Sequence, residues 1–172
     1  MFVVRKLTPT YDQNEDRIAL NAEAVGGDVM RLWCTQRLLN RVVRALTGMI
    51  DKERKAEVAF GNDDRQLHAF EQSVAQARLR PDTAVKVDPV NTAAKLLTSV
   101  DITPRDGRYT IIFKHDVAEV ALLGLTATEL RQWLGILHKL YKTAEWPVGH
   151  WPAWFSEAAA MPAGSGQTVQ LH

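Results

Sequence analysis

The stretch RIALNAEAVGGDVMRLWCTQRLLNRVVRALTGMI, residues 17–50, contains the change of hydrophobic period that decides the fold. Apolar side chains first recur at every second residue up to Cys34, which is the period of a strand with one buried face. Gly26 and Gly27 interrupt this alternation, and glycine readily supplies the positive φ of a tight hairpin turn. After Thr35, whose hydroxyl can cap a helix, apolar residues recur at spacings of three and four. The stretch therefore predicts an antiparallel hairpin that leads directly into an amphipathic helix.

The same two periods alternate along the rest of the chain. Helical spacing is found near Gln36–Lys55 and Asp64–Arg78, and two-residue alternation returns between Leu96 and Leu125. A last helix opens at Thr126-Ala-Thr-Glu129, which matches the capping-box pattern, and Pro147 ends it. This order predicts an α+β fold, namely an antiparallel β-sandwich or barrel-like sheet with an inserted helix-turn-helix pair and a C-terminal exit helix.

Length and composition are those of one soluble domain with an appendage. The 172 residues are 46% hydrophobic and 24% charged, so a core of useful size can form without disulfides or metals. We expect one α+β domain over residues 1–145 and an aromatic strap and tail over residues 146–172. A net charge of +1 gives the whole chain no attraction to nucleic acid or to an anionic membrane.

The chain also lacks the signals of secretion and of membrane insertion. Cys34 is the only cysteine, so no intramolecular disulfide can form. No apolar run approaches the roughly 18 residues of a spanning helix, and the N-terminal residues lack a signal-peptide pattern. We therefore expect a cytoplasmic protein with no membrane partner.

No motif in the sequence indicates catalysis or a cofactor. The histidines do not show the spacing of metal ligands, and no serine stands in a nucleophile-elbow pattern. Gly26-Gly27 is not followed by the third spaced glycine of a dinucleotide-binding loop. Cys34 lies within an apolar alternation, which favours a buried, inert thiol. We predict that the protein is not an enzyme and binds no metal and no cofactor.

Three of the five tryptophans lie within nine residues near the C-terminus. Trp146, Trp151 and Trp154, together with Phe155, carry a large apolar area that is unfavourable in water. One interpretation is that this segment folds back as an extended strap over its own sandwich. The other is that it forms a partner or dimer surface, since tryptophan is frequent in interface anchors.

Three arginines share one face of the first predicted helix. Arg37, Arg41 and Arg44 stand at i, i+4 and i+7, a spacing that aligns them along that helix. They could contact phosphates, but no groove-reading signature accompanies them. Two interpretations of these arginines therefore remain: a solvated helix face and a nucleic-acid contact.

The order of the predicted elements resembles the head domains of the DNA end-joining scaffold family and of the centriolar cartwheel family. The matching parts are the hairpin Arg17–Cys34, the helices within Gln36–Arg78, the meander Leu96–Leu125 and the exit helix from Thr126. The resemblance implies a dimerising scaffold without catalysis, and it carries over no functional residue. In those families the exit helix continues as a long coiled-coil stalk, whereas here Pro147 ends it after about three turns of heptad-like pattern.

These observations together predict a non-enzymatic protein–protein interaction or scaffold protein. We expect it to self-associate, most simply as a homodimer, and to bind a protein partner whose identity the sequence does not give. The alternative is a nucleic-acid accessory protein that uses the face formed by Arg37, Arg41 and Arg44.

Overall fold

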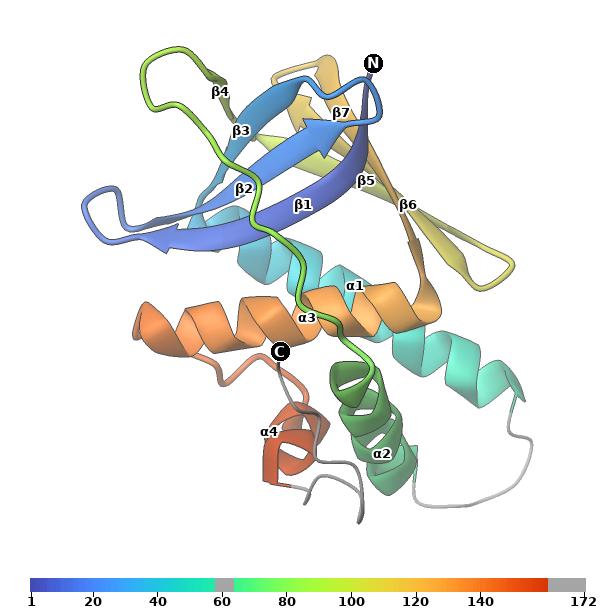
Figure 1. The fold of residues 1–172 in the computed structure, drawn as a ribbon. Coiled ribbons are helices and arrows are strands. Elements are labelled where there is room, and N and C mark those ends of the chain that lie inside the picture. The colour runs from blue at the N-terminus through green and yellow to red at the C-terminus, as the bar shows by residue number, and fades with distance from the viewer. Residues whose placement is uncertain (58–63, 161–172) are drawn as a thin grey trace.

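The computed structural model describes residues 1–57 and 64–160, and Figure 1 shows their arrangement. Seven strands and four helices alternate as groups along the chain, in the order β1–β3, α1–α2, β4–β7, α3–α4. The strands are β1 (Phe2–Asp12), β2 (Arg17–Ala24), β3 (Val29–Cys34), β4 (Ala93–Leu96), β5 (Ser99–Arg105), β6 (Arg108–His115) and β7 (Ala118–Thr126). The helices are α1 (Gln36–Glu57), α2 (Asp64–Ala77), α3 (Ala127–Thr143) and α4 (Ala153–Ala160).

The strands form one open sheet of seven in the order β4-β3-β2-β1-β7-β6-β5. The sheet is mixed, because β1 and β7 are parallel to each other, as are β3 and β4, while the other neighbours are antiparallel. The α+β class is confirmed, but the predicted sandwich or barrel is wrong. Alternation in the sequence shows that one face of a strand is buried, and here helices rather than a second sheet cover that face.

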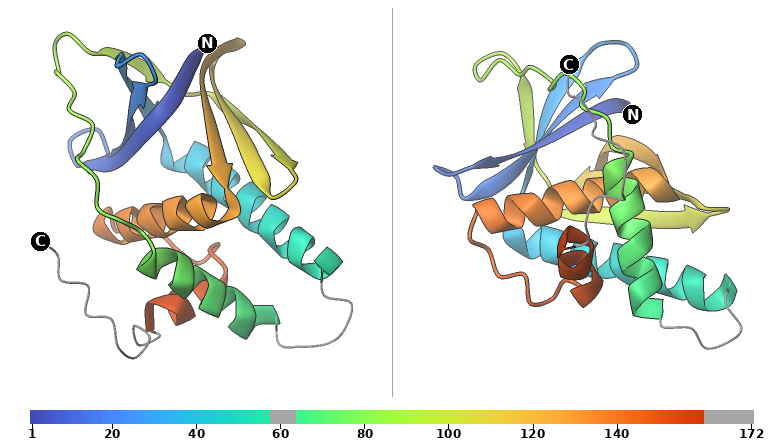
Figure 2. Two further views of the ribbon diagram at one scale, coloured as in Figure 1. Left: turned by 45° about the vertical axis from the view of Figure 1, so that its right-hand side comes forward. Right: turned by 60° about the horizontal axis from the view of Figure 1, so that its bottom comes forward.

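The two halves of the sheet meet at a short contact. β1 and β7 share only two register pairs, Phe2 with Ala121 and Val3 with Leu122. From this contact the halves β1–β4 and β5–β7 diverge, and α1 and α3 lie across the opening (Figure 2). A single buried cluster joins both halves to these helices, with Leu20 and Phe113 from the sheet and Leu46 and Leu134 from the helices.

Strand β1 runs through Thr8-Pro9, a pair that is typical of a strand end. It stays paired with β2 as far as Asp12. Beyond Val3, none of the described strands pairs with β1 on the side that faces β7. A proline lacks the N–H that a central strand needs, and an open edge tolerates this loss.

Local sequence signals at the helix ends are confirmed. The backbone N–H of Leu38 donates to the Thr35 hydroxyl at 3.2 Å, which caps α1. At the start of α3 the Glu129 N–H donates to the Thr126 hydroxyl, and the Thr126 N–H donates to the Glu129 carboxylate at 2.8 Å. This is the predicted capping box.

Helices α2 and α4 form a further layer beneath α3 (Figure 1). Helix α2 approaches α3 closely at Gly135, where an added Cβ would come within 2.8 Å of the Gln76 side chain. The predicted extended strap is wrong in one respect, because residues 153–160 form helix α4. Residues 161–172 of the predicted tail lie outside the described part of the chain. Among the described residues, no helix has the length and hydrophobicity needed to cross a membrane.

Candidate functional site

The aromatic cluster near the C-terminus is buried by its own chain. Trp146, Trp151, Trp154 and Phe155 are each no more than 6% exposed. The Trp146 indole N–H donates to the Asp16 carboxylate at 2.8 Å, which ties the segment to the β1–β2 turn. Of the two interpretations left open by the sequence, packing within the chain is the one observed. These side chains therefore offer no exposed aromatic anchor to a partner.

Ring stacking explains how α4 packs against α2 and α3. The rings of Trp154 and Phe155 stack with centroids 4.3 Å apart, and the His68 ring of α2 stacks on Trp154 at 5.2 Å. From α3, the His138 ring lies 4.9 Å from the Trp151 ring. Stacked and tilted aromatic pairs of this kind add stability beyond their buried area.

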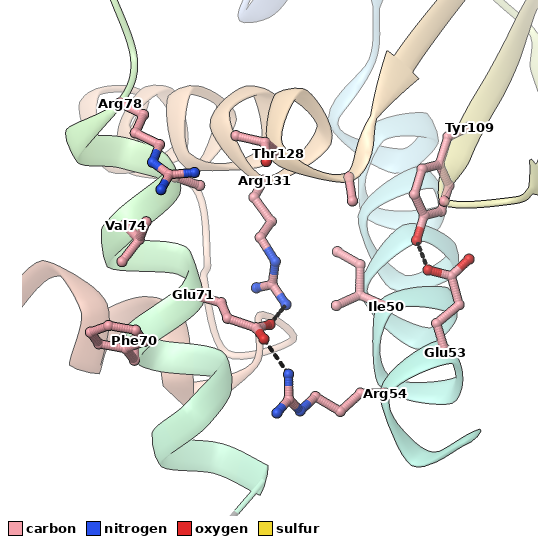
Figure 3. Close-up of a pocket in the computed structure, with 13 residues that line it drawn as sticks. Ile50, Glu53, Arg54, Phe70, Glu71, Val74, Arg78, Tyr109, Thr128 and Arg131 are labelled. Atoms are coloured by element: carbon pink, nitrogen blue, oxygen red, sulfur yellow. Dashed lines mark hydrogen bonds and ion pairs between the residues drawn. The ribbon is translucent and has the colours of Figure 1, made fainter. Parts of the chain in front are cut away.

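A cluster of charged side chains joins α1, α2 and α3 (Figure 3). The Glu71 carboxylate of α2 lies between two guanidinium groups, those of Arg54 in α1 and Arg131 in α3. The distance from Arg131 Nη2 to Glu71 Oε2 is 2.7 Å. Arg131 Nη2 also lies 3.2 Å from Nδ1 of His68, whose Nε2 is 3.2 Å from Asp51 Oδ1.

Burial changes the proton affinity of this cluster. It lowers the pKa of the Arg131 guanidinium, and the negative charge of Glu71 opposes that effect. It also lowers the pKa of His68, an effect to which the nearby Arg131 adds and which Asp51 opposes. The positive charge of Arg131 is therefore stabilised mainly by the neighbouring Glu71 carboxylate instead of by water.

A pocket of about 350 Å³ lies beside this cluster and is bordered by both charged and apolar groups. Phe70 and Val74 of α2 border it, and Tyr109 of β6 donates a hydrogen bond to Glu53 at its edge. The Glu71 carboxylate is already engaged by two arginines. The arrangement thus holds three helices together by compensating charges, and we assign it a structural role.

The three predicted arginines lie together on the exposed side of α1. Arg37, Arg41 and Arg44 border one shallow hollow with Gln36 and Asn40. All three are exposed, and none of them forms an ion pair with another described residue. The sequence prediction of one shared face is confirmed, and its three positive charges are not neutralised by neighbouring carboxylates.

Next to this face, a groove separates α1 from the outer strand β5. Its volume is about 260 Å³. It is bordered by Leu38, Arg41, Val42 and Ala45 of α1 and by Thr98, Ser99, Val100 and Ile102 at and next to the start of β5. Arg41 borders both the groove and the hollow of the three arginines. We call this region the α1–β5 groove.

Strand β5 forms one edge of the sheet, and among the described residues it pairs only with β6. Every second residue of such a strand directs its N–H and C=O away from the sheet, and these groups can pair with another chain. Val100 and Ile102 are only partly buried against the core. The groove thus combines an open hydrogen-bonding edge with apolar side chains and unneutralised positive charge.

The other candidates from the sequence are placed as follows. Cys34 is 1% exposed, and burial raises the pKa of its thiol to about 12. His115 is the last residue of β6, with Nδ1 2.7 Å from the Leu96 carbonyl oxygen. In the described ranges 1–57 and 64–160, no three His, Cys, Asp or Glu side chains gather in a way that could hold a metal ion.

Sequence reasoning found the arginine face but missed two other features of the structure. The α1–β5 groove depends on β5 being the last strand of the sheet, which no local pattern encodes. The cluster around Glu71 and Arg131 joins residues 60 positions apart. The one available signal was Arg131 itself, a charged residue beside the apolar stripe of the last helix.

Comparisons of this chain with models of protein families, with curated proteins and with solved structures found no match. The resemblance in element order to the two head-domain families therefore stays a prediction.

Proposed function

We propose that this protein is a protein–protein interaction module without catalytic activity. The observation that carries the proposal is the α1–β5 groove, where an open strand edge lies beside partly exposed apolar side chains. Soluble proteins usually protect such edges, because they pair readily with other chains. An edge that stays open next to an apolar groove is typical of surfaces that receive a partner.

Self-association is a narrower form of the same proposal. The prediction of a homodimer rested in part on the aromatic cluster, and those side chains are covered within one chain. What still supports a dimer is the resemblance to families that dimerise. The missing stalk speaks against it, because α3 already ends at Thr143. Sedimentation equilibrium of the purified full chain decides this point directly: a mass of twice 19.3 kDa supports the dimer, and a monomer mass contradicts it.

Site-specific photo-crosslinking in the native cell tests the proposed function. A benzoylphenylalanine replaces Thr103, which is exposed on β5, and a matched chain carries it at Val117 in the exposed β6–β7 turn. We expect discrete protein adducts from position 103 and few from position 117, because only the former lies on the open edge. The absence of protein adducts at both positions would count against an interaction function.

The second candidate function is binding to nucleic acid. The observation that favours it is the unneutralised face of Arg37, Arg41 and Arg44. Phosphate contacts weaken steeply as salt concentration rises, whereas an apolar contact does not. Binding of a single-stranded oligonucleotide that falls with salt, and that Arg41→Glu abolishes, would support this candidate.

A further inference from the structure

We propose that the α1–β5 groove binds an extended acidic segment of a partner protein, which adds as a further strand to β5. This inference rests on the proposed interaction function and names its partner by chemistry. Three properties of the groove support it: its backbone edge, its apolar lining and its charge.

The backbone edge sets the length of the segment that can pair. An added strand can pair with β5 from Ser99 to Thr103, because Pro104 has no N–H to offer to a further strand. A segment of about five residues therefore fits the edge, with its alternate side chains directed toward and away from α1.

The apolar lining sets which side chains the segment carries. On one wall lie Val100 and Ile102, which share a face of β5 because they are two residues apart. On the opposite wall Ala45 of α1 is exposed, and its small side chain leaves room beside Val42. Side chains of the added strand that face this space bury apolar surface, which favours binding.

The charge of the groove selects an acidic segment. Arg41 borders the groove itself, and Arg37 and Arg44 stand on the same face of α1. On the strand side, the one carboxylate of β5 is that of Asp101, which is already paired with Lys114. Carboxylates on the segment would therefore meet positive charge that no described residue neutralises.

The same observations disfavour the two other occupants. A second copy of this chain would present its own β5, whose one carboxylate, that of Asp101, is already paired with Lys114. Two such edges would also bring two arginine faces together. A nucleic acid would find no aromatic side chain in the groove on which to stack a base.

The test begins with a phage library of random twelve-residue peptides, panned on the full chain. Enriched peptides are synthesised, and their affinities are measured by fluorescence anisotropy. We expect alternating apolar residues with adjacent Asp or Glu. We also expect about tenfold or greater loss of affinity with Arg41→Glu and with Ala45→Phe, which fills the groove at an exposed helix position.

Matched variants on the same helix separate the groove from general effects. Lys52→Glu and Ala56→Phe change charge and size at exposed positions outside the α1–β5 groove, and they should leave affinity unchanged. Hydrogen exchange should show that the bound peptide protects amides between Ser99 and Thr103. All variants are first checked for an unchanged melting temperature, so that loss of binding is not loss of fold.

Three results would overturn the inference. The first is a library that yields no peptide above the level obtained on Ala45→Phe. The second is a set of peptides whose binding neither Arg41→Glu nor Ala45→Phe weakens. The third is oligonucleotide binding that Arg41→Glu abolishes and Ala45→Phe leaves intact. If crosslinking from Thr103 still yields protein adducts, the interaction function stands while this partner chemistry fails.

Discussion

The guanidinium group of Arg131 in α3 lies 5.3 Å from the centroid of the Trp154 ring in α4. A cation above an aromatic face is attracted by the ring's quadrupole, more strongly where water is excluded. Arg131 also binds the Glu71 carboxylate of α2. The buried Arg131 side chain thus contacts both α2 and α4 and stabilises their packing against α3. Through α4 it also stabilises the packing of the aromatic segment on the domain.

Replacement of Glu71 tests this arrangement. Glu71→Gln leaves the guanidinium groups of Arg54 and Arg131 without their shared carboxylate, so two partly buried positive charges face each other. We expect a loss of about 1–3 kcal/mol in the free energy of unfolding, less than for a fully enclosed pair because Glu71 is partly exposed. Urea unfolding measures it, and Glu119→Gln at an exposed position of β7 is the control. Equal stability of both variants would show that the cluster does not hold the helices.

Trp133 provides a test of the exit helix. Its side chain is 5% exposed, and its indole N–H has no hydrogen-bond partner among the described residues. Trp133→Ala should cost about 3–5 kcal/mol, because a large buried ring is lost and a cavity stays behind. Trp133→Phe should cost much less, since it keeps a ring and removes a buried donor that has no acceptor. Urea denaturation compares them, and an unchanged stability of Trp133→Ala would contradict the observed burial.

Cys34 should be inert in the folded protein. The thiolate is the reactive form, and burial raises the pKa of this thiol to about 12, so little thiolate exists near neutral pH. We expect labelling by a chromogenic disulfide reagent to be slow in native protein and to become fast in denaturant. Labelling of the native chain at the rate of a small free thiol would indicate an accessible, activated group instead.

Local patterns predicted the elements better than their assembly. The hairpin that ends at Cys34, the helix that follows Thr35 and the capping box at Thr126 each depend on residues a few positions apart. Strand order depends instead on distant pairings, such as the two register pairs that join β1 to β7. Alternation shows that a face is covered but not by what, so the sequence favoured a sandwich where α1 and α3 form the second layer.

The α1–β5 groove likewise depends on residues that are distant in sequence, which local patterns do not reveal. The arginine face was predictable, because one helix brings Arg37, Arg41 and Arg44 together at a fixed spacing. What this face can bind depends on the strand beside it, and Ile102 of β5 is 61 positions away from Arg41 in sequence. The aromatic segment was predicted to be buried, but the sequence did not show whether its own chain or a partner covers it. Its own chain covers it, through contacts between distant residues such as Trp146 and Asp16.

The histidine of the aromatic layer should make folding depend on pH. His138 of α3 is 4% exposed, and its ring lies 4.9 Å from the ring of Trp151 and 5.4 Å from that of Phe155. Burial lowers the pKa of this imidazole from 6.5 to about 4, and the nearby Lys142 adds to the shift. In the unfolded chain the imidazole keeps its ordinary pKa. Between about pH 6.5 and pH 4 the unfolded state therefore binds more protons than the folded state does.

Stability should consequently fall as pH is lowered through this window. The contribution of His138 is fully present above pH 6.5 and is lost progressively toward pH 4, with a total of about 3 kcal/mol. Urea unfolding at a series of pH values measures the slope. His138→Phe, which keeps a ring next to Trp151 and Phe155, should make the slope shallower. An equally steep slope in His138→Phe would assign the acid sensitivity to other groups, His68 first among them, because burial lowers its pKa as well.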